Sequence, residues 1–300
     1  MTIKHLVISG GGPLGLRYLG ALEKLEKENF WKVDNIETIY GTSVGSMIGA
    51  FICLKYDWET LNKYIIERPW NEVFKVNATQ ILDSYYNKGL FDKKLVEIIF
   101  KPLLQAKNIE LNVTLKEFYE FSKIDFHIFT FELNNFETIE LSHKTHPDLS
   151  LLQAVTMSSA FPGIFMPTII DKKCYIDGGV MCNYPINECL RDHTNKDEIL
   201  GIKCIYNKDN ISKNAEVTEE ISLLEYVICL TNNAINFIRS TIKLENINNT
   251  IECIVLDNSL NLLDFIQQTI TNPELRRQWM QMGEEDATKF LSTVNVSVVL

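Results

Sequence analysis

Short apolar runs alternate with amphipathic segments along the first part of the chain. The apolar run at residues 6–8 is followed by glycines and then by residues 16–25, in which apolar positions recur at helical spacing. The same order returns at residues 35–40, where a second apolar run leads through a sharp turn into an apolar-faced helix within residues 41–56. Two strand–turn–helix units in succession predict an α/β fold with a parallel sheet.

The middle of the chain changes from a helical pattern to a strand pattern. Apolar residues recur at helical spacing through much of residues 57–124. Within this stretch Asp92 is a candidate helix cap, and Thr114 with Glu117 forms a candidate capping box. After it the pattern predicts strands at residues 126–133 and 137–142 and a helix capped by Asp148 at residues 149–160.

The last third repeats both kinds of pattern without a long linker. The predicted elements are strands at residues 174–179, 198–207 and 251–257 and helices near residues 220–240 and 260–291. The polar stretch 207–220 is the best candidate for a mobile loop. Because no linker is long or polar enough to divide the chain, we predict one domain over residues 1–300.

Composition narrows the classes of function. The chain has 300 residues, of which 46% are hydrophobic, and a net charge of −10, which argues against nucleic acid as the main partner. No apolar stretch approaches the roughly 18 residues of a spanning helix, and the N-terminal run is too short for a signal peptide. Seven cysteines without a C-x-x-C pair predict neither a disulfide framework nor a zinc site. We therefore expect a cytoplasmic protein.

The first candidate for catalysis is a serine between two glycines. Gly41, Ser43 and Gly45 match G-x-S-x-G, directly after an apolar strand and before an apolar helix. This pattern places a serine on a tight strand-to-helix turn, where its hydroxyl projects beyond the edge of the sheet. The alternative interpretation is a helix start that happens to be flanked by glycines.

A nucleophilic serine needs a base, and two residues are candidates. His193 lies in the polar run 190–198, where a solvent-exposed side chain is the more common outcome. Asp177 ends an apolar strand and precedes Gly178 and Gly179, which allow the backbone to turn away sharply. An aspartate before two glycines is also a common turn sequence.

Three blocks of residues resemble, in order, the signature blocks of the patatin-like phospholipases. These are residues 10–15, residues 41–45 and residues 177–179, and residues 158–167 are similar to the segment that precedes the catalytic aspartate in that family. The resemblance runs from about residue 4 to residue 206. It implies a three-layer α/β/α sandwich in which Ser43 and Asp177 form a dyad that hydrolyses acyl esters of lipids, without calcium.

The resemblance also implies a lipid substrate, phospholipid above all, and peripheral contact with membranes. The helical segment 51–124 would then supply a lid or docking surface. Its candidate interfacial residues are Trp58, Trp70, Tyr85, Tyr86, Leu90 and Phe91. Most such side chains lie in protein cores, so no docking residue is selected among them.

One position departs from the family pattern. The first block of the family often carries Arg or Lys where this chain has Leu14. No electrostatic role is therefore expected at that position. Arg17, one helical turn on, is either a replacement or an ordinary solvent-facing arginine.

The glycine block itself has two interpretations. Gly10, Gly12 and Gly15 fit the dinucleotide fingerprint G-x-G-x-x-G, which would make the protein a nucleotide-binding oxidoreductase. That site needs an acidic residue at the end of the second strand, and Asp34 lies before this strand instead. We therefore expect no nucleotide cofactor, and we expect the N–H groups of Gly10, Gly11 and Gly12 to form an oxyanion hole, with Gly15 just before a helix that begins near Leu16. A catalytically silent lipid-binding scaffold of the same fold stays a further alternative.

Overall fold

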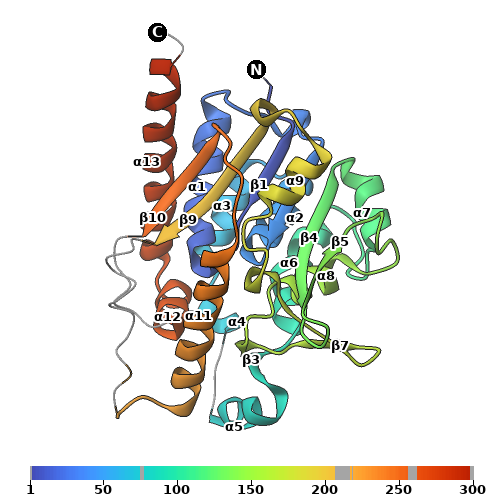
Figure 1. Ribbon diagram of the computed structural model, residues 1–300, viewed down its shortest axis with the longest axis vertical. Coiled ribbons are helices and arrows are strands. Elements are labelled where there is room, and N and C mark those ends of the chain that lie inside the picture. The colour runs from blue at the N-terminus through green and yellow to red at the C-terminus, as the bar shows by residue number, and fades with distance from the viewer. Residues whose placement is uncertain (1, 75–77, 207–216, 218, 256–261, 298–300) are drawn as a thin grey trace.

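A mostly parallel sheet forms the centre of the computed structural model, which describes residues 2–74, 78–206, 217, 219–255 and 262–297 (Figure 1). The strand order is β10-β9-β1-β2-β4-β8-β7, and β5 pairs with β4. Strands β10, β9, β1, β2 and β4 are parallel, whereas β5 and β8 run antiparallel to β4, and β7 runs antiparallel to β8. The strands of this sheet are β1 (His5–Ile8), β2 (Thr38–Thr42), β4 (Asp125–Glu132), β5 (Glu137–Leu141), β7 (Thr168–Ile170), β8 (Lys173–Asp177), β9 (Ile199–Tyr206) and β10 (Thr250–Val255).

Helices cover both faces of this sheet, and two short strands pair apart from it. The short strands are β3 (Gly89–Phe91) and β6 (Gly163–Phe165), which are parallel to each other. The helices in the first half are α1 (Gly15–Lys27), α2 (Val44–Cys53), α3 (Trp58–Glu67), α4 (Trp70–Val73), α5 (Ala78–Asn87), α6 (Lys94–Ala106) and α7 (Leu115–Ser122). Those in the second half are α8 (Leu151–Ser158), α9 (Ile186–Asp192), α11 (Leu223–Thr241), α12 (Leu262–Thr271) and α13 (Pro273–Ser297).

Alternating residues of the central strands build two cores. Leu6 and Ile8 of β1 join a large cluster with α1, α2, α6 and α8, and α13 packs along α1. Val7, between them, faces the opposite side and joins a smaller cluster with Tyr40 of β2 and Ile186 of α9. The predicted three-layer α/β/α arrangement is therefore confirmed.

Most predicted elements are present, with several corrections. The capping box of Thr114 and Glu117 is formed at α7, and the Asp92 carboxylate accepts the N–H of Lys94 at the start of α6. Asp148 is not the cap of α8, because Ser150 accepts the N–H of Gln153 instead. The helix predicted at 260–291 is two helices that meet at Pro273.

Some elements fall outside the predictions or outside the described residues. The pattern gave no sign of β3, β6, β7 or α9, which are only three to seven residues long. Most of the predicted loop 207–220 lies outside the described residues. Within the described part of the chain, every helix is too short or too polar to cross a membrane.

Candidate active site

Strand register brings Ser43 and Asp177 to the same level of the sheet. Thr42, the last residue of β2, pairs with Phe129 of β4, and the next residue of β4, Thr130, pairs with Asp177 at the end of β8. Ser43 follows Thr42 and is therefore level with Asp177 across β4. Strand β8 runs antiparallel to β4 and starts beyond the carboxyl end of β4, so its last residue, Asp177, still lies close to the edge at which the parallel strands end.

Ser43 is the single residue between β2 and α2, and its backbone is strained. Its dihedral angles are φ 55° and ψ −125°, a conformation that residues with a Cβ rarely adopt. Gly45 makes this turn possible, because a Cβ there would lie 2.2 Å from the carbonyl oxygen of Ile8 in β1. Gly41, in β2, also lies against the backbone of this turn. The predicted strand-to-helix elbow is therefore present.

The Ser43 hydroxyl donates to the Asp177 carboxylate. The distance from Ser43 Oγ to Asp177 Oδ2 is 2.7 Å. The other carboxylate oxygen, Oδ1, accepts the N–H of Gly179 at 2.7 Å, in the turn that begins at Gly178. The Ser43 N–H donates to Ser158 Oγ, which in turn donates to the carbonyl of Phe129. Both side chains are thus oriented by hydrogen bonds to neighbouring elements.

Asp177 is only 3% exposed, and this burial has the largest effect on the pKa of its carboxyl. Burial raises the pKa of its carboxyl above the ordinary value, because desolvation disfavours the charged form. The hydrogen bonds from Ser43 and Gly179 and the positive charge of Arg239 act in the opposite direction, and together they are weaker. A carboxylate with a raised pKa is a better proton acceptor than an exposed one.

The glycine block after β1 is fixed at Gly10. The Gly10 N–H donates to the carbonyl of Asn183 at 2.9 Å, and the Gly10 carbonyl accepts from Ser9 Oγ at 3.0 Å and from Tyr18 Oη at 3.3 Å. Asn183 Nδ2 approaches the same carbonyl at 3.4 Å. The N–H of Gly10 is thus engaged in the fold, so it is not a candidate oxyanion donor, contrary to the expectation from the sequence.

Gly11 and Gly12 differ from Gly10 in this respect. Among the described residues, none accepts a hydrogen bond from the N–H of Gly11 or Gly12. Gly12 has a φ of +54°, which suits a glycine, and no atom lies within 4 Å of where its Cβ would be. Gly15 follows as the first residue of α1. Two unpaired N–H groups at the start of a helix form a suitable site for a negative oxygen.

These residues line one cavity of about 330 Å³. Its polar lining includes Gly11, Gly12, Ser43, Asp177, Asn183 and Arg239. Most of the remaining wall is apolar, with contributions from Met47, Phe51, Trp70, Phe74, Phe91 and Phe165. A few convergent polar groups at one end of an apolar cavity suit a ligand with a long hydrocarbon part.

Several residues weighed in the sequence lie elsewhere. His193 caps the end of α9 and stacks on His5, the first residue of β1, at the edge of the sheet opposite to Ser43. A dinucleotide site needs an acidic residue at the end of β2. Asp34 lies before β2 instead, and the residue that follows β2 is Ser43. Arg17 is neither at the site nor solvent-facing, because it is buried and donates to Asp286 Oδ1 at 2.8 Å.

Four residues of the site went unnoticed in the sequence. Tyr18 and Asn183 hold the glycine block, Ser158 holds the Ser43 backbone, and Arg239 of α11 donates from Nε to the carbonyl of Gly179. Only Ser158 lies in a segment that the sequence analysis had singled out. Across the described part of the chain, no three His, Cys, Asp or Glu side chains are grouped in a way that could hold a metal ion.

Comparisons with known proteins agree with this geometry at the level of family and fold. The family model described as "Patatin-like phospholipase" matches residues 6–190. A protein of Invertebrate iridescent virus 6 named "Probable lipid hydrolase 463L" is 30% identical over 200 residues, which are 65% of this chain and 66% of that protein. An uncharacterized protein of Acanthamoeba polyphaga mimivirus is 30% identical over 186 residues, which are 61% of this chain and 60% of that protein. The chain thus matches slightly less than two thirds of the length of each viral relative.

A solved structure extends the likeness of fold beyond the family match. VipD from Legionella pneumophila aligns with 97% of this chain and 67% of its own chain, with a TM-score of 0.56 and 16% identity. At this identity the likeness concerns the fold alone. It includes the C-terminal helices, which lie outside residues 6–190.

Proposed function

The chain belongs to the patatin-like phospholipase family, and from that premise we propose that it hydrolyses carboxylic esters of lipids, with Ser43 as the nucleophile and Asp177 as the base. The name of the iridescent virus relative, a lipid hydrolase, supports this class of reaction. The observation that carries the proposal for this chain is the 2.7 Å hydrogen bond from Ser43 Oγ to Asp177 Oδ2 at the polar end of an apolar cavity. Phospholipid is the expected substrate class.

In the first half of the reaction Ser43 Oγ attacks the ester carbonyl carbon while its proton passes to Asp177 Oδ2. The carbonyl oxygen becomes an alkoxide, which accepts hydrogen bonds from the N–H groups of Gly11 and Gly12. Donors fixed in this way contribute about 3 kcal/mol each to transition-state stabilisation. The intermediate then collapses, and the leaving alcohol or lysolipid takes the proton from Asp177. The acyl group stays on Ser43 as an ester.

In the second half a water molecule attacks the acyl-enzyme. Asp177 accepts a proton from this water, the Gly11 and Gly12 N–H groups again hold the alkoxide, and Ser43 Oγ leaves with the proton from Asp177. The products are a fatty acid and the free serine. No histidine takes part, in keeping with the position of His193 at the opposite edge of the sheet.

The proposal is tested with Ser43→Ala and Asp177→Asn on labelled phospholipids and neutral glycerolipids. Each change should lower hydrolysis at least about a thousandfold, because nucleophile and base act as one unit. A fluorophosphonate probe should label the unchanged protein and leave Ser43→Ala unlabelled. Circular dichroism checks that both variants keep the fold.

Matched controls separate the proposal from its alternatives. Ser292→Ala on α13 and Asp34→Asn before β2 change exposed residues of the same types and should leave hydrolysis and labelling unchanged. If the Asp177→Asn variant kept its activity, the dyad would be wrong. If the unchanged protein reacted with no probe and hydrolysed no ester, it would instead be a catalytically silent lipid-binding scaffold.

A further inference from the structure

Helix α5 presents an apolar face that nothing in the described structure covers. Leu82, Tyr85 and Tyr86 occupy positions i, i+3 and i+4 of α5, and each is between 73% and 78% exposed. Residues at this spacing lie on one face of a helix. Of the six aromatic and apolar residues weighed for interfacial contact in the sequence, Trp70, Leu90 and Phe91 are buried, whereas Tyr85 and Tyr86 are exposed.

The first half of α11 presents a second face of the same kind. Leu223, Tyr226, Val227 and Leu230 follow the spacing i, i+3, i+4 and i+7, and they are between 43% and 73% exposed. Ile228, on the other side of the helix, is buried. Large exposed apolar side chains at helical spacing are uncommon on a soluble surface and indicate a binding face.

The two faces belong to one end of the molecule. Helix α5 packs on β3, α11 packs on β6, and β3 pairs with β6, so a two-stranded sheet connects the two helices. In Figure 1 both α5 and the start of α11 lie at the lower end of the view, below the carboxyl ends of the parallel strands. We call these seven residues of α5 and α11 the apolar end face.

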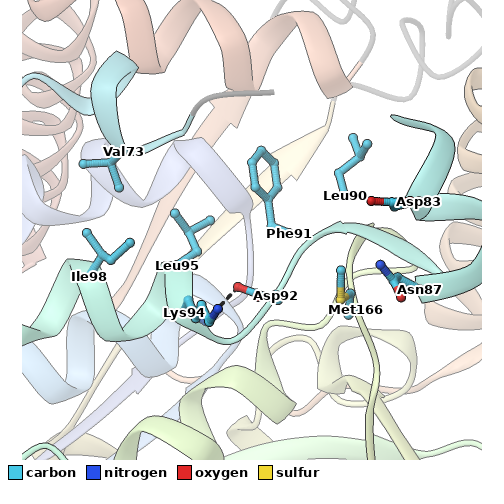
Figure 2. Close-up of a pocket in the computed structure, with 10 residues that line it drawn as sticks. All are labelled: Val73, Asp83, Asn87, Leu90, Phe91, Asp92, Lys94, Leu95, Ile98 and Met166. Carbon is cyan, nitrogen blue, oxygen red and sulfur yellow. Dashed lines mark hydrogen bonds between the residues drawn. The ribbon is translucent and has the colours of Figure 1, made fainter. Parts of the chain in front are cut away.

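The apolar end face adjoins the cavity that contains Ser43. Asp83 and Asn87, on the inner side of α5, line a second cavity of about 310 Å³, together with Leu90, Phe91 and Leu95 (Figure 2). Phe91 lines this cavity and the cavity of Ser43 as well. Helix α11 also contributes Arg239 to the cavity of Ser43. Helix α11 thus forms part of the wall of the Ser43 cavity, and α5 forms part of the wall of the second cavity, which shares Phe91 with it.

The residue types of the apolar end face indicate which kind of partner it binds. Tyrosine and leucine suit the boundary between lipid headgroups and acyl chains, where an apolar body meets a polar layer. Recognition of anionic lipids would need a cluster of Lys or Arg. The only charged residues within 82–86 and 223–230 are Asp83 and Glu225, in a chain of net charge −10. A neutral, zwitterionic lipid surface is therefore the matching partner.

We propose that the apolar end face docks on a zwitterionic lipid surface, so that the cavity of Ser43 opens toward the layer from which the substrate is taken. This inference rests on the proposed lipid hydrolysis, because docking would bring the substrate to Ser43. Docking itself can be measured without hydrolysis. Insertion of Leu82, Tyr85 and Tyr86 would orient α5 on the surface, and Leu223, Tyr226 and Leu230 would add a second point of contact. Two linked contacts bind a surface more tightly than either contact alone.

The test is flotation with phosphatidylcholine vesicles, carried out on Ser43→Ala protein so that binding is separate from catalysis. The triple change Leu82→Ser, Tyr85→Ser, Tyr86→Ser should lower the partition coefficient at least about tenfold, since each buried apolar side chain contributes to partition. The triple change Leu223→Ser, Tyr226→Ser, Leu230→Ser should have a smaller effect in the same direction. Phe121→Ser, an exposed aromatic residue on α7, is the matched control and should bind as before.

A second measurement separates docking from chemistry. With Ser43 intact, the α5 triple variant should hydrolyse p-nitrophenyl butyrate, a soluble monomeric ester, at the unchanged rate while losing hydrolysis of vesicle lipid. Equal vesicle binding by the variants and the control would overturn the docking face. Binding only to vesicles that contain phosphatidylserine, or to no vesicle at all, would also overturn it. Failure of the proposed function is distinct, because it would remove hydrolysis of the soluble ester from the unchanged protein.

Discussion

Ser43 holds a backbone conformation that costs free energy in the folded state. Residues with a Cβ at positive φ in such a turn are destabilised by roughly 1–3 kcal/mol, and the surrounding structure must compensate. Here the compensation comes from the hydrogen bonds of the Ser43 N–H to Ser158 and of Ser43 Oγ to Asp177, and from the close packing of Gly45 against β1. The strain projects the hydroxyl away from the sheet, where a substrate can reach it.

This strain predicts an unusual order of stabilities at position 43. Ser43→Gly and Ser43→Ala both lose the hydroxyl, but only glycine relieves the backbone. We expect Ser43→Gly to be the more stable of the two by about 1 kcal/mol in chemical denaturation, after the greater unfolded-state entropy of glycine is included. At Ser46, inside α2, the same pair of changes should give the opposite order, because glycine there costs about 0.5–1 kcal/mol relative to alanine. The same order at both positions would rule out strain at Ser43.

The environment of Asp177 predicts how activity depends on pH. As a base Asp177 must be deprotonated, so kcat/KM should rise as the pH increases through its pKa, which burial holds above the ordinary value. The charge of Arg239 lowers this pKa. Replacement of that arginine in Arg239→Gln should therefore move the acidic limb of the pH profile to higher pH.

The control for this prediction is Lys243→Gln, which removes the same charge from an exposed position just after α11. Because solvent screens exposed charges, its pH profile should coincide with that of the unchanged protein. An acidic limb that stayed in place, or moved to lower pH, in Arg239→Gln would show that Arg239 does not act on the base.

At the scale of elements, the sequence predicted what local pattern determines. The strands with apolar runs, the two strand–turn–helix units and the capping box of α7 all depend on neighbours within a few residues, and each is present. The pairing of Ser43 with Asp177 was expected from the family resemblance and the glycines around both residues. The geometry of this pair depends on the register of β2, β4 and β8, which cannot be predicted from local sequence patterns.

The features that the sequence analysis missed or predicted wrongly depend on contacts between residues distant in the chain. Strands β3 and β6 have three residues each and are stabilised by pairing with each other across more than seventy residues of chain. Three glycine donors were expected after β1, yet the Gly10 N–H is taken by Asn183, which is distant in sequence. Arg17 follows a helical pattern that would suit a surface position, but α13 covers it and supplies Asp286. Tertiary contacts decided each of these cases.

At the scale of the whole molecule, the C-terminal helices are packed into the same core as the family region. Helix α13 lies along α1, which starts directly after the glycine block, and Arg17 of α1 also donates to the carbonyl of Ile254 in β10 at 2.8 Å. Residues beyond 190 thus support the helix that directly follows the candidate oxyanion donors Gly11 and Gly12. The single domain over residues 1–300 stays a prediction, and it requires that these C-terminal helices unfold together with the rest of the chain.

A substitution at Gly283 of α13 tests whether α13 unfolds together with the region that contains Ser43. A Cβ at Gly283 would lie 1.9 Å from the carbonyl oxygen of Arg17, so the two helices touch through backbone at this point. Gly→Ala in a helix normally stabilises by about 0.5–1 kcal/mol, but Gly283→Ala should destabilise the protein by about 1–3 kcal/mol because α13 must move away from α1. Glu285→Ala, exposed on the same helix, should change little. In denaturant, helicity and hydrolysis of a soluble ester should be lost in one coincident transition at a lower midpoint; separate transitions would mean that α13 unfolds apart from the site.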